Sequence, residues 1–289
     1  TKTLTIQPKG LTVSGAQVAS RAYDGTTIGV VSGGTLVGVV ATDAVTLDNS
    51  AVAGTFADRL IGTNKSVSVT GYALAGVDAS NYTVSQPTGL TADITGKTLT
   101  ISGATVADKV YDGGAAALIS GATLVGVVGA EDVSLANDTS GTFAQADVGS
   151  GISVSTAMTL IGVDKDAYIL QQPSSLMADI TPMPVTVTAR SASKVAGSEE
   201  PVLGFDTEPS LVAGDNFSGS LTRESGESAG EFNILQGTLT AGANYQLTFV
   251  PANFTIVPRT LLAITGASVT GRAYDGTRAA TVDFSLAEL

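Results

Sequence analysis

The chain has 289 residues, carries 14 lysine and arginine residues against 26 aspartate and glutamate residues, and lacks histidine, cysteine and tryptophan, which gives a formal net charge of −12. Without histidine or cysteine it can form no Ser-His-Asp triad, no Cys-His pair, no disulfide and no zinc site with nitrogen or sulfur ligands. Its cations are scattered singly, so nucleic acid and anionic membrane surfaces are not expected partners, because both require clustered positive charge.

Short strands are predicted along the whole chain. The apolar run at 36–40 predicts a strand covered on both faces, and alternation of apolar and polar residues at 66–69 and 99–101 predicts half-buried antiparallel strands. A second apolar run follows at 124–128, and alternation returns at 185–188 and 247–250. Single helical turns are expected only near Asp43, at Glu131-Asp132 and at 198–201. The 34 glycines and the 5% aromatic content are typical of many short strands joined by tight turns.

No apolar run reaches the roughly 18 residues of a membrane-spanning helix. The residues after Thr1 lack the basic and apolar regions of a signal peptide, so any export signal or anchor is expected outside this sequence.

Internal repeats dominate the sequence. Residues 11–46 align without a gap to residues 99–134, with 19 of 36 positions identical at an offset of 88, and the match continues at offsets of 87 and 86. The start of the repeat returns at 262–276, whereas residues 183–258 form a different unit. Each loss of one residue falls in a loop-like stretch, which is typical of homologous modules with constrained strands.

The repeats divide the chain into modules separated by linkers of one to three residues that contain proline or glycine. We expect residues 1–8 to be the last strand of a preceding module, 9–96 and 97–182 to be two complete copies, 183–258 to be the different module and 259–289 to be a truncated third copy. Linkers this short predict modules held end to end as a rod. The predicted fold class is all-β, with each module a small antiparallel sandwich that is Ig-like or β-grasp-like.

Six of the seven tyrosines occupy two recurring positions. One set precedes Asp-Gly, and the other begins a predicted late strand of each module. This regularity predicts structural rings that lie in the core or cover turns. The residues are Tyr23, Tyr111 and Tyr274 before Asp-Gly, and Tyr82, Tyr168 and Tyr245 at the late strand.

The motifs around these tyrosines resemble two known families. The pattern V-x-x-K/R-x-Y-D-G, followed by G-x-L-x-G-V and G-T-F-A, resembles the YDG-type repeat of large bacterial surface adhesins. Residues 183–258, with Ser193-Lys194-Val195 and Asn244-Tyr245-Gln246-Leu247, resemble the MBG-type module of the same proteins. That module usually carries Tyr-Gly after the lysine, where this chain has Val195-Ala196-Gly197.

The resemblance implies a function outside the cell. It implies filamentous-haemagglutinin-like adhesins exported by two-partner secretion, located at the bacterial cell surface and active in adhesion and in the biofilm matrix. The expected partners are an extracellular polysaccharide or another cell's surface, bound through the full-length adhesin, and neighbouring copies of the same filament. Under this hypothesis the chain is a structural stalk, with no catalytic residues, no enzyme activity and no cofactor.

A binding hypothesis remains open beside the structural one. A phenol next to a carboxylate can hydrogen-bond a sugar or help to hold Ca²⁺, whereas Asp-Gly also suits the left-handed positions of a two-residue hairpin, whose edge the tyrosine would cover. The turn hypothesis is favoured, because no acidic loop has the D-x-D-x-D-G spacing of a strong calcium motif. The candidate ligand residues are Tyr23, Asp24, Tyr111, Asp112, Tyr274 and Asp275, and the candidate turn glycines are Gly25, Gly113 and Gly276.

A self-formed isopeptide crosslink is the last alternative. Such a bond needs a buried lysine beside an acidic catalyst, but Lys9 and Lys97 lie at module junctions. Lys109 is replaced by arginine in the other copies, and arginine cannot react in this way. We therefore do not expect one.

Overall fold

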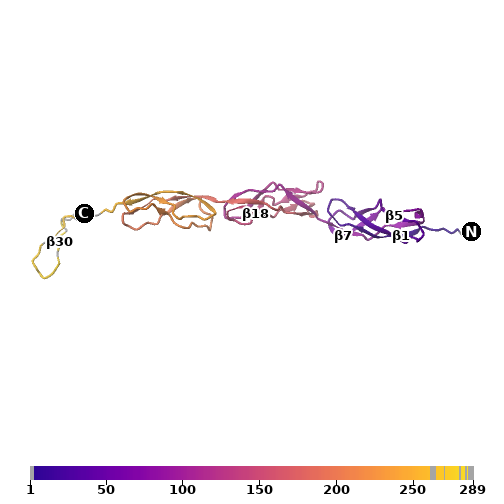
Figure 1. The fold of residues 1–289 in the computed structure, drawn as a ribbon, viewed down its shortest axis with the longest axis horizontal. Coiled ribbons are helices and arrows are strands. Elements are labelled where there is room, and N and C mark those ends of the chain that lie inside the picture. The colour runs from indigo at the N-terminus through magenta and orange to yellow at the C-terminus, as the bar shows by residue number, and fades with distance from the viewer. Residues whose placement is uncertain (1–2, 261–264, 270, 280, 284, 286–289) are drawn as a thin grey trace. The chain divides into compact units, whose positions relative to one another are not determined.

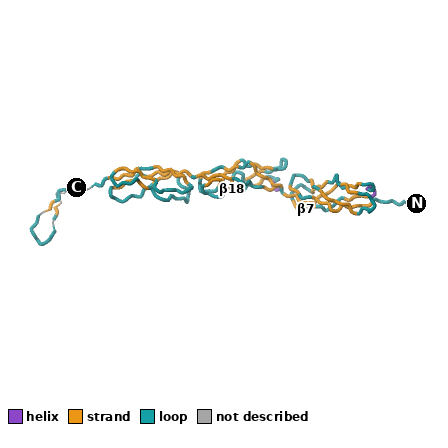
Figure 2. Tube along the Cα trace, in the orientation of Figure 1, coloured by secondary structure: helices purple, strands orange, loops and turns teal. Residues whose placement is uncertain are grey.

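The computed structural model describes residues 3–260, 265–269, 271–279, 281–283 and 285. It divides into two compact units, one of Thr1–Lys109 with Gly114–Ile180 and one of Val110–Gly113 with Thr181–Leu289. Strands and loops alternate along the described chain (Figure 2), and the helical segments assigned there are two single 3₁₀ turns, η1 (Ala79–Asn81) and η2 (Lys165–Ala167). The all-β prediction, with modules in tandem, is confirmed.

The positions predicted for helical turns were wrong. Near Asp43, Glu131 and Ser198 the chain forms hydrogen-bonded turns, in which these backbone N–H groups donate to the carbonyls of Val40, Val128 and Val195. The two 3₁₀ turns instead precede the late tyrosines, Tyr82 and Tyr168.

Module 1, residues 9–96, contains three sheets, and Figure 1 labels β1, β5 and β7 within it. Their strand orders are β4-β1-β9, β2-β10-β7-β6-β3 and β5-β8. The strands are β1 (Lys9–Val18), β2 (Arg21–Ala22), β3 (Ile28–Gly29), β4 (Val31–Val37), β5 (Thr46–Asp48), β6 (Ala53–Phe56), β7 (Gly62–Thr70), β8 (Ala73–Ala75), β9 (Tyr82–Ser85) and β10 (Thr91–Thr95).

The first and last strand segments of module 1 pass together from one sheet to the other. β1 pairs in parallel with β9 in the first sheet, and β2 then pairs in parallel with β10 in the second. The other strand pairs of this module are antiparallel. Module 1 is therefore mainly antiparallel, as predicted, and its two parallel pairs arise because the segments that open and close the module run in the same direction.

Module 2, residues 97–182, repeats this plan with sheet orders β15-β11-β20, β12-β14-β17-β18-β21-β13 and β16-β19. Figure 1 labels β18 within it. The strands are β11 (Lys97–Ser102), β12 (Thr105–Val106), β13 (Lys109–Val110), β14 (Ala116–Ser120), β15 (Thr123–Val125), β16 (Ser134–Ala136), β17 (Ser140–Phe143), β18 (Gly149–Thr156), β19 (Thr159–Ile161), β20 (Tyr168–Leu170) and β21 (Met177–Thr181).

Module 3, residues 183–258, has two sheets with orders β24-β22-β27 and β23-β28-β26-β25, and it keeps the two parallel pairs, β22 with β27 and β23 with β28. The strands are β22 (Met183–Ala189), β23 (Ala192–Val195), β24 (Phe205–Glu208), β25 (Thr222–Arg223), β26 (Gly230–Leu235), β27 (Tyr245–Val250) and β28 (Asn253–Val257).

The predicted third copy at 259–289 falls partly outside the described residues. Within its described part, β29 (Ser268–Val269) pairs antiparallel with β30 (Val282–Asp283), which Figure 1 labels. No helix among the described residues is long and apolar enough to cross a bilayer.

Alternating side chains fill the core between the sheets. Val67 and Val69 of β7 are buried while Ser66 and Ser68 are exposed, as the alternation predicts. One cluster of buried residues joins Phe56 of β6 and Ile94 of β10. Because a strand's side chains point alternately to opposite faces, each such strand contributes one face to the core.

The prediction that the two apolar runs form strands covered on both faces was wrong. Residues 36–40 and 124–128 form the ends of the edge strands β4 and β15 and the loops that follow them. Val37, Val40 and Val125 are exposed.

We predict that Leu11→Ala costs about 2–5 kcal/mol of unfolding free energy, because removing a fully buried leucine side chain leaves a cavity. Leu11 is 0% exposed. Chemical denaturation followed by circular dichroism measures the change. Leu4→Ala is the matched control, since Leu4 is 87% exposed, and should stay within about 0.5 kcal/mol of the parent chain. Equal losses for both variants would contradict this core assignment.

Candidate functional site

Each module presents a tyrosine hydroxyl bonded to a carboxylate, an arrangement we call the acceptor site. In module 1 the Tyr82 hydroxyl accepts a hydrogen bond from the Val40 backbone N–H at 3.2 Å and donates to Asp43 Oδ2 at 2.6 Å. Tyr82 begins β9, directly after the 3₁₀ turn, and the carboxylate lies in the loop after β4. The same strand order therefore positions the same groups in every copy.

The other two modules repeat the acceptor site with one change of acid. In module 2 the Tyr168 hydroxyl accepts from the Val128 N–H at 3.0 Å and donates to Glu131 Oε2. In module 3 the Tyr245 hydroxyl accepts from the Val212 N–H at 2.9 Å and donates to Asp215 Oδ2 at 2.5 Å.

Within the first unit, Tyr23 of module 1 occupies the acceptor site of module 2. Its hydroxyl donates to Glu131 Oε1 at 2.5 Å, and its ring meets the Tyr168 ring edge to face, with centroids 5.6 Å apart and planes at 77°. Tyr23 is 3% exposed. The buried cluster of module 1 continues through this ring to Leu99 and Tyr168 of module 2. The two modules thus share a core at this contact.

The turn around Asp24 and Gly25 directs Tyr23 toward module 2. The Tyr23 N–H donates to the Thr95 carbonyl, and Asp24 Oδ1 accepts from both the backbone N–H and the hydroxyl of Thr26 at 2.8 Å. Gly25 has a φ of +80°, and a Cβ there would lie 2.9 Å from Val128 of module 2. Glycine is required here both for its backbone conformation and for the close approach.

The turn is not the two-residue hairpin predicted from Asp-Gly. Strands β2 and β3, which flank it, lie at opposite edges of the five-stranded sheet. The chain therefore crosses the end of the module at this turn, which explains why the tyrosine reaches a neighbouring module instead of covering its own strand edge.

A cation completes this contact. Arg59 Nη1 donates to Glu131 Oε1 at 2.8 Å and to the Tyr23 hydroxyl at 3.1 Å. The repeat alignment places Ala146 at the corresponding position of module 2. The cation is therefore a feature of one copy, whereas the tyrosine and the acid recur.

The second unit contains the same contact. Tyr111 donates to Asp215 Oδ2 at 2.9 Å, and its ring meets Tyr245 with centroids 5.5 Å apart and planes at 77°. Gly113 has a φ of +77°, and a Cβ there would lie 2.6 Å from Val212. Tyr111 belongs to the 97–182 repeat by sequence, but Val110–Gly113 groups with the second unit.

The third Tyr-Asp-Gly turn has the same internal hydrogen bonds, but its tyrosine is exposed. Asp275 Oδ1 accepts from the N–H and hydroxyl of Thr277, both at 2.9 Å, and Gly276 has a φ of +82°. Tyr274 is 94% exposed. Asp24, Asp112 and Asp275 are all exposed, and none of them lies at an acceptor site.

Module 3 carries alanine where the other modules carry this tyrosine. The Ala196 N–H donates to the Val257 carbonyl, as the Tyr23 and Tyr111 N–H groups donate to Thr95 and Thr181. Module 3 therefore has an acceptor site of its own but no phenol at the position that would reach a following module.

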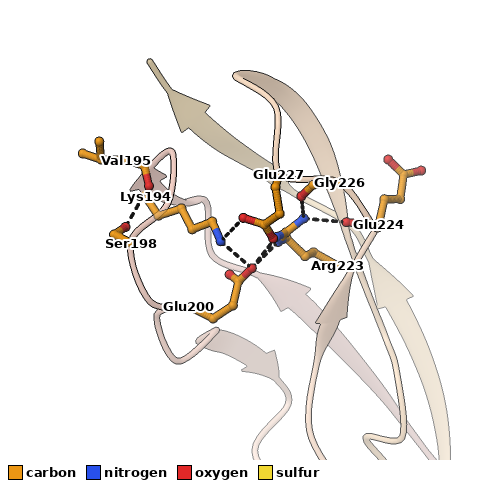
Figure 3. Close-up of polar contacts among 8 residues, drawn as sticks. All are labelled: Lys194, Val195, Ser198, Glu200, Arg223, Glu224, Gly226 and Glu227. Atoms are coloured by element: carbon orange, nitrogen blue, oxygen red, sulfur yellow. Dashed lines mark hydrogen bonds and ion pairs between the residues drawn. The ribbon is translucent and has the colours of Figure 1, made fainter. Parts of the chain in front are cut away.

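Module 3 instead concentrates charge beside that position. Lys194 Nζ lies 3.0 Å from Glu200 Oε1 and 2.7 Å from Glu227 Oε2, and Arg223 bonds the same two carboxylates (Figure 3). The Arg223 guanidinium also lies over the rings of Phe232 and Phe254, at 5.4 and 5.0 Å. Two cations and two anions thus balance one another around a nearly buried lysine.

These contacts disfavour an isopeptide bond at Lys194. Its hydrogen bond with Glu227 comes first among the interactions that raise the pKa of Lys194, followed by those with Glu200, against the opposing effect of burial. A raised pKa keeps the amine protonated, and only the neutral amine is a nucleophile.

The described residues contain no group of three or more aspartate, glutamate, histidine or cysteine side chains suited to a metal ion.

Burial and hydrogen bonding shift the pKa values at the acceptor sites. Burial, and then the hydrogen bond to Glu131, raises the pKa of Tyr23 to about 12, while burial and the bond to Asp215 raise the pKa of Tyr245 to about 12. Burial opposes ionisation of Glu131, but hydrogen bonds from Tyr168 and Tyr23 and the charge of Arg59 hold its pKa below its ordinary value.

The sequence alone identified the tyrosines, and it singled out Asp43 and Glu131 only as repeated acidic loops that could hold Ca²⁺, not as partners of the tyrosines. Asp43 and Glu131 occupy the same repeat position at the offset of 88, and both are acidic. The signal available in the sequence was that both copies carry an acid at this position. It was obscured because the acid is aspartate in one copy and glutamate in the other. Asp215 lies in the divergent module and has no such alignment.

We predict that Tyr23 and Tyr245 ionise near pH 12, above the ordinary value of about 10 for tyrosine. Because the folded state favours the protonated phenol, the stability from these contacts is complete below pH 10 and is lost as pH rises through about 12. Ultraviolet titration of tyrosinate measures this, and Tyr23→Phe should shrink the phase at highest pH. A single phase near pH 10 for all tyrosines would contradict the geometry.

We predict that Lys194→Met lowers the unfolding midpoint of module 3, because Glu200 and Glu227 lose their ion pairs with a lysine side chain that is 4% exposed and keep only those with Arg223. Lys165→Met is the matched control, since the Lys165 side chain is half-exposed and its ion-pair partner among the described residues is its neighbour Asp166. Chemical denaturation measures both variants. Equal midpoints for the two variants would show that the ion pairs around Lys194 contribute nothing.

Comparison with known proteins places the repeats in families. The YDG domain matches residues 7–89 and 95–175, and the MBG domain (YGX type) matches residues 185–255. No curated protein sequence matches the chain. A solved structure of surface layer protein SbsC, domains 4–9, aligns at 11% identity with a TM-score of 0.14, over 90% of this chain and 49% of that one, which is too weak to bear on fold or function.

The YDG matches cover more than half of the chain, and the MBG match falls on the divergent module with Ala196. The chain belongs to the YDG domain family and carries one MBG-type repeat module.

Proposed function

We propose that the chain is a segment of the stalk of a secreted bacterial surface adhesin, in which modules in series carry a distal binding region away from the cell. In this proposal the chain has no enzyme activity, and its product is distance and mechanical persistence. An extracellular polysaccharide or another cell's surface is bound through the full-length adhesin, and neighbouring copies lie in the same filament.

The observation that carries the proposal is the repeated tyrosine–carboxylate contact. Tyr23 meets Glu131 and Tyr168, and Tyr111 meets Asp215 and Tyr245, with ring centroids 5.6 and 5.5 Å apart. A stalk needs successive modules to resist bending, and a linker alone fixes only the distance between them. Within the first unit, the buried contact between modules 1 and 2 supplies an angular constraint.

Repetitive binding of polysaccharide or Ca²⁺ by the Tyr-Asp-Gly turns is the weaker candidate. The hydroxyls of Tyr23 and Tyr111 already donate to carboxylates, and both side chains are buried. Asp24 and Asp275 already accept hydrogen bonds from threonine within their own turns. A ligand would have to replace these bonds before it gained contacts of its own.

We predict that Tyr23→Ala loosens the junction between modules 1 and 2. The chain has no cysteine, so Ser50→Cys and Asp138→Cys introduce a spin-label pair with one label in each module. Pulsed electron resonance should give a narrow distance distribution in the parent chain and a broad one after Tyr23→Ala, because the buried ring and its hydrogen bond to Glu131 are lost.

Tyr274→Ala is the matched control, because it removes the tyrosine of the same motif where that side chain is 94% exposed. It should leave the distribution unchanged. A distribution that is already broad in the parent chain, or that Tyr23→Ala leaves narrow, would overturn the stalk proposal. Saturable heat of binding with Ca²⁺ that disappears in Asp24→Ala would favour the binding candidate.

A further inference from the structure

The acceptor site of module 1 has the same parts as the two occupied ones. Tyr82, the Val40 N–H and Asp43 correspond to Tyr168, Val128 and Glu131 in module 2. Among described residues, the hydrogen-bond partners of Asp43 all belong to module 1. Val40 is 45% exposed, whereas Val128 and Val212 are half-buried beneath the glycines of the turns that contact them.

We infer that this site is a docking site for the Tyr-Asp-Gly turn of a further YDG module, joined through residues 3–7. The inference rests on the proposed function, since it extends the same junction by one module. It commits to an occupant on the same polypeptide, because a covalent link raises the effective concentration of a small contact far above that of a free partner.

Residues 3–7 supply a second, independent observation. Ile6 occupies the position before the linker that Ile94 and Ile180 occupy in the next two modules. Ile94 and Ile180 are 2% and 1% exposed, but Ile6 is 87% exposed. Leu4 is equally exposed, where the corresponding Ala92 is buried. The segment therefore has the apolar pattern of a last strand, with its core side chains uncovered.

The occupied junctions specify how the further module would sit. The Tyr23 and Tyr111 N–H groups donate to the carbonyls of Thr95 and Thr181, each two residues before the next module begins. Gln7 is the corresponding residue ahead of Lys9. The further module's tyrosine would therefore bond the Gln7 carbonyl through its N–H and Asp43 through its hydroxyl.

The same geometry selects the type of module. A module with alanine at the Ala196 position presents no phenol to the site, so the occupant must carry Tyr-Asp-Gly. Asp43 and Glu131 fill the same position in the two YDG modules, so either carboxylate length is expected to serve in module 1.

The test extends the full chain by one module. A copy of residues 9–90 is joined directly ahead of Thr3, so that residues 3–7 become the last strand of the copy. Cysteines replace Ser50 of the copy and the chain's own Ser50, which reproduces the positions of the label pair at residues 50 and 138. We expect the distance distribution at the added junction to be as narrow as that at the junction between modules 1 and 2.

Variants then separate the contact from the linker. Asp43→Ala should broaden the distribution at the added junction several-fold, and so should replacing the tyrosine of the copy by alanine, while Asp43→Glu should keep it narrow. If the distance distribution is broad at the added junction but narrow for the label pair at residues 50 and 138, this inference is overturned and the stalk proposal is not. Insensitivity to Asp43→Ala also overturns it. A broad distribution for the 50 and 138 pair overturns the stalk proposal, and this inference with it.

Discussion

A phenol that donates to a carboxylate of the next module is the interaction on which the arrangement of the first unit depends. Tyr23 is nearly inaccessible to solvent, and its hydroxyl and ring are both engaged by module 2. A hydrogen bond to an ionised acceptor is stronger than one between neutral groups, and its loss would leave the half-buried carboxylate of Glu131 short of a donor. The contact therefore makes the position of module 2 depend on the folded turn of module 1 that carries Tyr23.

The copies vary around this constant pair of groups. Arg59 adds a cation in module 1, where module 2 has Ala146, and the acid is glutamate in module 2 but aspartate in modules 1 and 3. Module 3 keeps the acceptor site but replaces the tyrosine with Ala196 and places an ion-pair network nearby. All three modules thus keep the acceptor site. Only the YDG modules keep the tyrosine before Asp-Gly that can reach another module.

Much of the fold could be predicted from the sequence, because strand alternation and the 88-residue repeat both reflect local chemistry. The burial of Val67 and Val69 follows from period-two alternation, and the buried tyrosines follow from their regular spacing. The parallel pairing of β1 with β9 and the path of the turn at Asp24 could not be predicted, because both depend on strands distant in sequence. The role of Glu131 was missed because its partner Tyr23 lies 108 residues away.

A double-mutant cycle between Tyr23 and Glu131 tests this account most directly. Tyr23→Phe, Glu131→Ala and the double variant are compared by chemical denaturation of the full chain. The account predicts that the two substitutions are coupled by more than about 0.5 kcal/mol, the level reached by residues in direct contact. Additive effects would contradict it, since they would mean that the phenol and the carboxylate contribute separately and that no bond joins the two modules.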